Sequence, residues 1–269
     1  MTDTKTRTID IALEVDATVE EVWRAVSDPA GLQNWFPLKA SGGQGVGEQV
    51  LLSWGEGVEW PTTITIWEPN QRLRWEDNWV PEGMDTQLIV DIFIETKDGQ
   101  TVVRLVHSGF AVGDKWDDHY FGVDTGWRMM LQNLKHYVEH HAGTPREMVH
   151  ERPRLPGPRG EAWKRLFGGS DGLLKDEPSG LAPSGSVTLA LGPDMEFEGR
   201  VEALVDAHGN GIAISIPGLN DAFMIIELEP GEADTHCGLW LSTYGLPKDR
   251  GAALQTALTG KVKSILGAF

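Results

Sequence analysis

The sequence contains little cysteine and no long apolar run. Cys237 is the single cysteine among 269 residues, so no internal disulfide forms, and the strand-like stretch THCGLWLS predicts a buried, inert thiol. No apolar stretch is long enough to span a bilayer, and the start of the chain lacks the apolar run of a signal peptide. We therefore expect a cytoplasmic protein with no membrane insertion.

Basic residues are also scarce. Lys and Arg total 23 against 40 Asp and Glu, and the formal net charge is −17. Nucleic acids and anionic membranes attract proteins through basic surface, so the composition argues against both as partners. Solubility alone is enough to explain the acidity.

Tryptophan, by contrast, is abundant. Of the 11 Trp residues, most lie before residue 128. Each indole buries a large apolar area and keeps one N–H donor. Two interpretations follow, a tryptophan-rich core and a cavity lined by rings.

The first residues predict a strand and two short helices. Residues 8–15 alternate apolar and polar side chains, as a half-buried strand does. Thr18 and Glu21 form a capping-box pattern at the start of a helix. Asp28 then caps a second, short helix with Pro29 at its first position.

Further along, several segments alternate as strands and one long segment is amphipathic. Residues 124–141 carry an apolar stripe at helical spacing, with Asp124 as the expected cap. A curved antiparallel sheet around this helix leaves a cavity between them, and Trp35 and Phe36 lie near its mouth. The strand candidates are EQVLLSW, EWPTTITIW, RLRWEDNW, TQLIVDIFIET and TVVRLVHS.

The second half of the chain repeats the first in outline. EAWKRLFGGSDGL resembles EVWRAVSDPAGL, and the later strand and helix patterns follow in the same order. We expect an α+β protein of two tandem domains, at residues 1–143 and 161–269. Residues 144–160 are rich in Pro and Arg and predict a linker. The second domain has only Trp163 and Trp240, which favours a more aliphatic interior.

Three motifs carry a family resemblance. VEEVWRAVSDPAGLQNWF, TITIWEPNQRLRWEDNW and HSGF followed by GWRMMLQNLKHYVE resemble the SRPBCC (START-like, helix-grip) superfamily, in the branch of the activator of the heat-shock chaperone ATPase. The resemblance is clear over residues 8–142, and residues 161–269 resemble a degenerate second copy. It implies a helix-grip fold whose cavity binds hydrophobic or amphipathic small molecules.

Candidate ligand-binding residues follow from the expected cavity. His107 shares strand parity with apolar neighbours, so it is either a polar group inside the cavity or a histidine that ends a strand. We predict no catalytic residue and no cofactor. The expected lining residues are Trp35, Phe36, Trp54, Trp67, Trp75, Phe93, His107, Trp127 and Leu131.

Two other clusters have simpler interpretations. His136, His140 and His141 have metal-like spacing, but they end a helix, where imidazoles also interact with the dipole, and no third type of ligand completes a site. We therefore predict no metal. Asp117 and His119 precede the long helix and are expected in a solvated lid.

The sequence leaves three functions open. Binding of a hydrophobic or amphipathic small molecule in the first domain is the main prediction. The alternatives are a co-chaperone that binds a chaperone protein and stimulates its ATPase through acidic surface and the Arg-rich linker, and an enzyme of the cyclase or hydrolase type. The enzyme needs a polar pair inside the cavity, and only His107 stands out.

Overall fold

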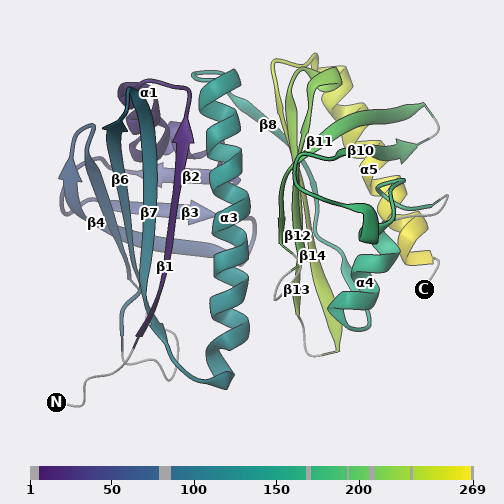
Figure 1. Cartoon of the computed structure of the whole chain (residues 1–269), viewed down its shortest axis with the longest axis horizontal. Coiled ribbons are helices and arrows are strands. Elements are labelled where there is room, and N and C mark those ends of the chain that lie inside the picture. Colours follow the sequence, from purple (N-terminus) through teal and green to yellow (C-terminus); the bar gives the residue numbers. More distant parts are fainter. Residues whose placement is uncertain are drawn as a thin grey trace. The chain divides into compact units, whose positions relative to one another are not determined.

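The structure, a computed structural model, has two compact units (Figure 1). One unit comprises residues 1–120 and 133–144, and the other comprises residues 121–132 and 145–269. The structure describes residues 6–78, 86–167, 171–192, 194–205, 210–230 and 233–267.

The first unit is built on a seven-stranded antiparallel sheet with the strand order β1-β7-β6-β5-β4-β3-β2. Most strands pair with the next one along the chain, as short turns between antiparallel strands require. The elements, which Figure 1 labels, are β1 (Thr6–Val15), α1 (Val19–Ser27), α2 (Pro29–Leu32), β2 (Lys39–Gly42), β3 (Gln49–Ser53), β4 (Glu59–Glu68), β5 (Arg72–Asp77), β6 (Ile89–Lys97), β7 (Gln100–Ala111) and α3 (Asp117–His140).

The caps of the two short helices are those that the sequence predicts. The Thr18 side chain accepts a hydrogen bond from the Glu21 backbone, and the Glu21 carboxylate accepts one from the Thr18 backbone. Asp28 accepts from the Ala30 backbone, and Pro29 occupies the first turn of α2. Because these contacts satisfy the free N–H groups, α1 and α2 begin at defined positions.

The long helix starts earlier than predicted. It begins at Asp117 rather than at Asp124, so Asp117 and His119 belong to its first turn and not to a loop. Acidic side chains at a helix start interact favourably with the helix dipole, which explains why Asp117 and Asp118 can begin it. Asp124 lies inside the helix and pairs with Arg128 at 2.8 Å.

The second unit repeats this order of elements. Its sheet runs β10-β11-β12-β13-β14-β8, with β9 also paired to β14. The elements are β8 (Arg146–Glu151), β9 (Arg154–Pro156), α4 (Arg159–Leu166), β10 (Ser186–Gly192), β11 (Met195–Val205), β12 (Asn210–Ile216), β13 (Ala222–Pro230), β14 (Asp234–Tyr244) and α5 (Lys248–Gly267). The molecule is thus an α+β protein with two curved antiparallel sheets, each followed in the chain by a long helix (Figure 1).

Residues 144–160 are not a linker, contrary to prediction. β8 pairs with β14 from Glu151 to Arg146, and β9 pairs with the other end of the same strand. Pro145, Pro153 and Pro156 fall at or next to an end of these short strands, and Pro158 directly precedes α4, so none of them removes a hydrogen bond from the middle of the sheet. This segment therefore supplies the first strand of the second unit.

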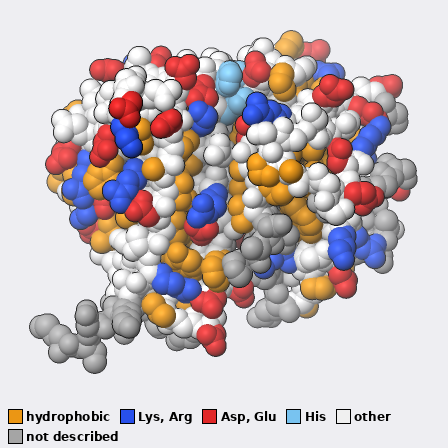
Figure 2. Space-filling view, viewed as in Figure 1, with side chains coloured by type: hydrophobic (Ala, Val, Ile, Leu, Met, Phe, Trp, Pro, Cys, Tyr) orange, Lys and Arg blue, Asp and Glu red, His pale blue; other side chains and the backbone are white. Residues whose placement is uncertain are grey.

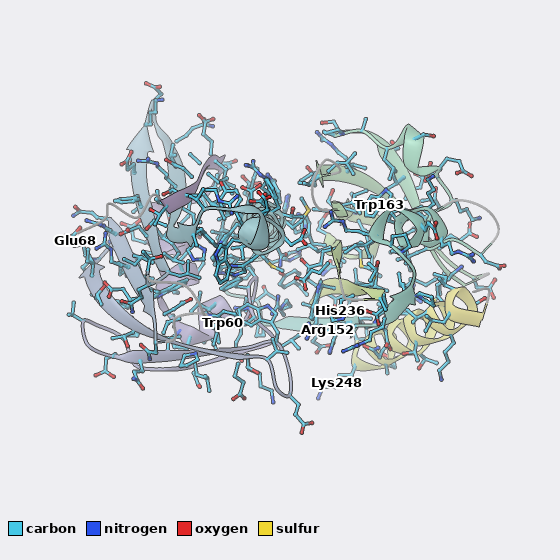
Figure 3. The ribbon with its side chains drawn as sticks, turned by 90° about the horizontal axis from the view of Figure 1, so that it is seen from below. Trp60, Glu68, Arg152, Trp163, His236 and Lys248 are labelled. Atoms are coloured by element: carbon cyan, nitrogen blue, oxygen red, sulfur yellow. The ribbon has the colours of Figure 1, made fainter. Side chains whose placement is uncertain are left out.

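The interior of the second unit is mostly aliphatic, as the sequence predicted. One face of its sheet packs against α5 through the helix residues Leu254, Leu258, Val262 and Ile265. In the same core, Trp163 of α4 (labelled in Figure 3) packs edge-on against Phe167 at 4.4 Å between ring centroids. The face that holds α5 is therefore a packed core.

Candidate functional site

The first sheet has one face, here called the inner face, on which apolar side chains and a few titratable groups lie together. Residues that pair directly across antiparallel strands point to the same face. One row of such pairs crosses five strands, from β1 to β4. It contains Ile9, His107, Val90, Trp75 and Ile64, all buried.

Three of the predicted rings lie together at the helix pair. Trp35 stacks on Phe36 at 5.1 Å, and Phe36 meets Trp54 edge-on at 5.2 Å. Trp35 is fully buried, its indole N–H donates to the Ala25 carbonyl, and its own carbonyl accepts from Asn133 of α3. Hydrogen bonds therefore hold Trp35 in place, whereas Phe36 and Trp54 remain half-buried beside it.

Trp67 also lies on the inner face. It pairs across the sheet with Leu73, and the helix α1 reaches it through an edge-on contact between Trp23 and Trp67 at 5.1 Å. Trp60 and Glu68, near the two ends of the same strand, are labelled in Figure 3. The inner face thus combines Trp67 and Trp75 with the ring cluster of the helix pair.

Phe93 was predicted on the wrong face. Its cross-strand partners are Arg72 and Arg104, and both guanidinium groups lie over its ring, at 4.9 and 5.8 Å. This opposite face, here called the outer face, also carries Asp91, which pairs with Arg72 and Arg74 at 2.8 and 2.9 Å. The ring of Phe93 therefore supports a network of charges and does not line the inner face.

Trp127 and Leu131 are buried, but they lie in the part of α3 that belongs to the second unit. In that unit the same part of α3 reaches β12, because a Cβ added to Gly211 would lie 2.9 Å from Cγ2 of Thr125. The structure does not bring Trp127 and Leu131 into the first unit with the other predicted residues.

His107 lies inside β7 and not at its end, and it points to the inner face of the sheet. Its ring lies 4.6 Å from Phe110, which in turn contacts His119 and Tyr120 of α3. Burial, with a smaller effect from His119, lowers the pKa of His107 to about 3. The imidazole is therefore neutral at physiological pH, and it can accept or donate a hydrogen bond without carrying a charge.

Asp77 is a buried carboxylic acid on the inner face that the sequence interpretation missed. It is 6% exposed, and Oδ2 accepts a hydrogen bond of 2.9 Å from the indole N–H of Trp60. Burial raises its pKa to about 6, which the bond from Trp60 offsets only in part. The signal was in the alternation, since Leu73, Trp75 and Asp77 share one parity on β5.

The three histidines at the end of α3 do come close together. The ring of His136 lies 4.7 Å from that of His140 and 5.6 Å from that of His141. Among the residues that the structure describes, no group of three or more His, Cys, Asp or Glu side chains has an arrangement that could hold a metal ion.

Charged side chains of both signs lie on the surface. On the face drawn in Figure 2, Lys and Arg side chains are interspersed with Asp and Glu side chains. Each helix in the described part of the chain is too short or too polar to cross a bilayer.

The fold and the inner face define a helix-grip type of protein, and comparison with known families agrees. Residues 16–139 match the family described as activator of Hsp90 ATPase homolog 1-like protein. This match agrees with the resemblance of the motifs to that family. No curated protein sequence matches the chain.

Solved structures resemble the chain at low identity. An Aha1 dimer from Colwellia psychrerythraea is 26% identical over 51% of this chain and 99% of its own, with a TM-score of 0.44. BexL, a di-domain ARO/CYC from the BE-7585A biosynthetic pathway, is 18% identical over 97% of this chain and 96% of its own, with a TM-score of 0.46. DynU16, a protein in the dynemicin biosynthetic locus, is 18% identical over 97% and 96%, with a TM-score of 0.43.

Proposed function

We propose that the first unit binds a hydrophobic or amphipathic small molecule against the inner face of its sheet. The observation that carries the proposal is the composition of that face, where Trp67 and Trp75 lie with two buried titratable groups, His107 and Asp77. Ligand sites combine apolar and aromatic walls with a few polar groups that orient the ligand.

The contrast with the second unit supports this assignment. There the face that holds α5 is filled by buried, mostly aliphatic side chains. A core that needs only to be stable avoids buried ionisable groups, because a buried charge costs free energy unless it is paired. In the first unit Asp77 keeps its ionisable carboxyl group, and we assign that group a role in binding.

Binding is tested with N-phenyl-1-naphthylamine, an uncharged apolar fluorophore. We expect saturable fluorescence enhancement with one site per chain, and weaker binding in a Trp67→Leu variant. Phe93→Leu is the matched control, because it also replaces a half-buried ring by leucine, but on the outer face. The proposal fails if the native protein shows no saturable binding, or if both variants weaken binding equally.

A second candidate function rests on the family match. The description of that family names activation of the Hsp90 ATPase, so a co-chaperone role is the alternative. Its predicted contact, the Arg-rich segment, is built into the second sheet, where Arg152 lies 5.6 Å from the Trp240 ring. An unchanged ATPase rate of purified Hsp90 with an excess of this protein would eliminate the alternative.

An enzymatic role of the cyclase or hydrolase type is the third hypothesis. It needs polar groups that reach one substrate, and His107 and Asp77 now share a face. They lie on β7 and β5 with β6 between them, so they are not neighbours across one ladder. Binding, unlike catalysis, does not require His107 and Asp77 to act on the same part of a ligand, and we favour the binding function for that reason.

A further inference from the structure

The surroundings of Asp77 leave its carboxyl group short of donors. Its partners across the sheet are Thr62 on β4 and Leu88 on β6, and neither is charged. The Thr62 hydroxyl donates to the carbonyl of Val50. Trp60 supplies one N–H to Oδ2, whereas an ionised carboxylate can accept about four hydrogen bonds.

Arg7 and His107, which also lie on the inner face, do not compensate for the missing donors to Asp77. Arg7 on β1 is held by Asp117 at 2.6 Å and by the carbonyl of Ala111 at 3.1 Å. His107 stays neutral because it is buried. The raised pKa of Asp77 agrees with a carboxylate whose burial exceeds what its partners offset.

Asp91 shows what a satisfied carboxylate looks like in the same sheet. On the outer face, Arg72 and Arg74 together donate four hydrogen bonds to its two oxygens, at 2.8–3.0 Å. The two guanidinium groups also bring two positive charges to this one carboxylate. Asp77, by contrast, accepts a side-chain hydrogen bond from one neutral donor, the indole N–H of Trp60.

We propose that Asp77 selects the ligand of the first unit by its polar end, favouring amphiphiles whose head group donates a hydrogen bond, such as an alcohol or an amine, over those that end in a carboxylate. This inference rests on the proposed function. A donor supplies what the buried carboxylate lacks, whereas a second carboxylate adds like-charge repulsion where little water screens it.

The test compares three amphiphiles with one chain length: decylamine, decanol and decanoate. The displacement of N-phenyl-1-naphthylamine by each amphiphile is measured at pH 7.5. At this pH Asp77 is ionised, because its pKa is about 6. We expect decanol and decylamine to bind roughly tenfold or more tightly than decanoate. In Asp77→Asn this preference falls to threefold or less, mainly because decanoate binds better.

Glu76→Gln is the matched control. It is the neighbouring residue on β5, it points to the outer face, and the change removes the same charge. Its Oε1 accepts a hydrogen bond from Thr65, which a glutamine oxygen can also accept. The long-range effect of the negative chain on decanoate is the same in both variants, so a preference that survives in Glu76→Gln and disappears in Asp77→Asn belongs to Asp77.

The two proposals fail in different ways. If none of the three amphiphiles displaces the fluorophore and the fluorophore itself does not bind, the proposed function is wrong. If all three bind the native protein with similar affinity, or if Asp77→Asn keeps the native preference, selection by Asp77 is wrong while binding by the first unit stands. Circular dichroism of Asp77→Asn confirms that the comparison is made on folded protein.

Discussion

Each unit has a carboxyl group that accepts a hydrogen bond from a tryptophan, but the two groups lie in different settings. In the first unit Asp77 accepts from Trp60 on the inner face of the sheet. In the second, Glu227 of β13 accepts from Trp240 of β14 at 2.8 Å. Glu227 alternates with Ile226 and Leu228, which face α5, so it points to the other side of its sheet.

The neighbours of Glu227 explain how it fits. Its partners across the sheet are Gly211 on one side and Gly238 on the other. A Cβ at Gly238 would come within 2.4 Å of the Trp240 indole nitrogen and 2.8 Å of the Glu227 carboxylate. Gly238 therefore leaves room for the hydrogen-bonded pair of Glu227 and Trp240, and these two side chains fill the space above it.

The two units have similar folds, but they differ in which face of the sheet carries this carboxyl group. In the second unit, the face that holds α5 carries a packed apolar core, and the half-buried Glu227 lies on the opposite face. In the first unit, the buried Asp77 lies on the same face of the sheet as Trp67, Trp75 and His107. This difference is the reason for the proposal that the first unit binds the ligand. The following changes test the contrast, from the largest expected effect to the smallest.

Leu258→Ala removes a fully buried side chain from the core between α5 and its sheet. We expect the free energy of unfolding of the second unit to fall by about 2–5 kcal/mol, because the change leaves a cavity. Hydrogen exchange measured by mass spectrometry reports each unit separately. Leu51→Ala, at a side chain 37% exposed on β3, is the control and should change stability by less than about 0.5 kcal/mol.

Glu227→Gln should stabilise the second unit at neutral and alkaline pH. Burial and the neighbouring Glu229 raise the pKa of Glu227 from 4.5 to about 7. The unfolded chain therefore ionises first, and native stability falls as the pH rises from about 4.5 to about 7. The variant lacks this loss, so its advantage grows from near zero below pH 4.5 to about 1–3 kcal/mol at pH 8. Denaturant unfolding across this pH range measures it, and an advantage that does not change with pH would contradict the assignment.

Asp77→Asn should show the same sign in the first unit with a smaller size. Its pKa is raised from 3.8 to about 6 by burial, so native stability falls between these pH values. We expect the variant to gain about 1–2 kcal/mol at pH 8. Glu76→Gln on the outer face should keep the native dependence of stability on pH.

Thr18→Ala tests the cap of α1. The hydroxyl accepts the Glu21 N–H, so its loss should cost about 1 kcal/mol. Thr18→Ser keeps the hydroxyl and should stay within a few tenths of a kcal/mol of the native value. Thermal unfolding followed by circular dichroism distinguishes the two. Equal stability of both variants would mean that the capping box contributes nothing measurable.

Much of the fold could be predicted because its signals are local. Alternation along the strands and the cap residues Thr18 and Asp28 depend on neighbouring residues alone. The strands β8 and β9 were missed because their prolines and arginines resemble a linker, and only pairing with β14 makes them strands. Such pairing joins residues far apart in the chain and leaves little local trace.

The positions of the candidate site residues could be predicted only in part, and their role in binding stays a prediction. Trp35, Phe36 and Trp54 do lie together, and His107 is buried on the inner face. Phe93 was chosen for its ring, although its parity with Asp91 placed it on the outer face. Asp77 was overlooked for the opposite reason, because an acidic residue in a strand usually points to water.

The edge strand β8 has one further consequence. Gln255 of α5 donates to the carbonyl of His150 and accepts from its backbone N–H, both at 3.0 Å. The amide of one glutamine thus occupies hydrogen-bonding groups that another polypeptide would otherwise use to add a strand. A protein cut before Lys248 would lose α5 and, with it, the two hydrogen bonds from Gln255 to the edge strand. We expect such a protein to self-associate into β-rich aggregates.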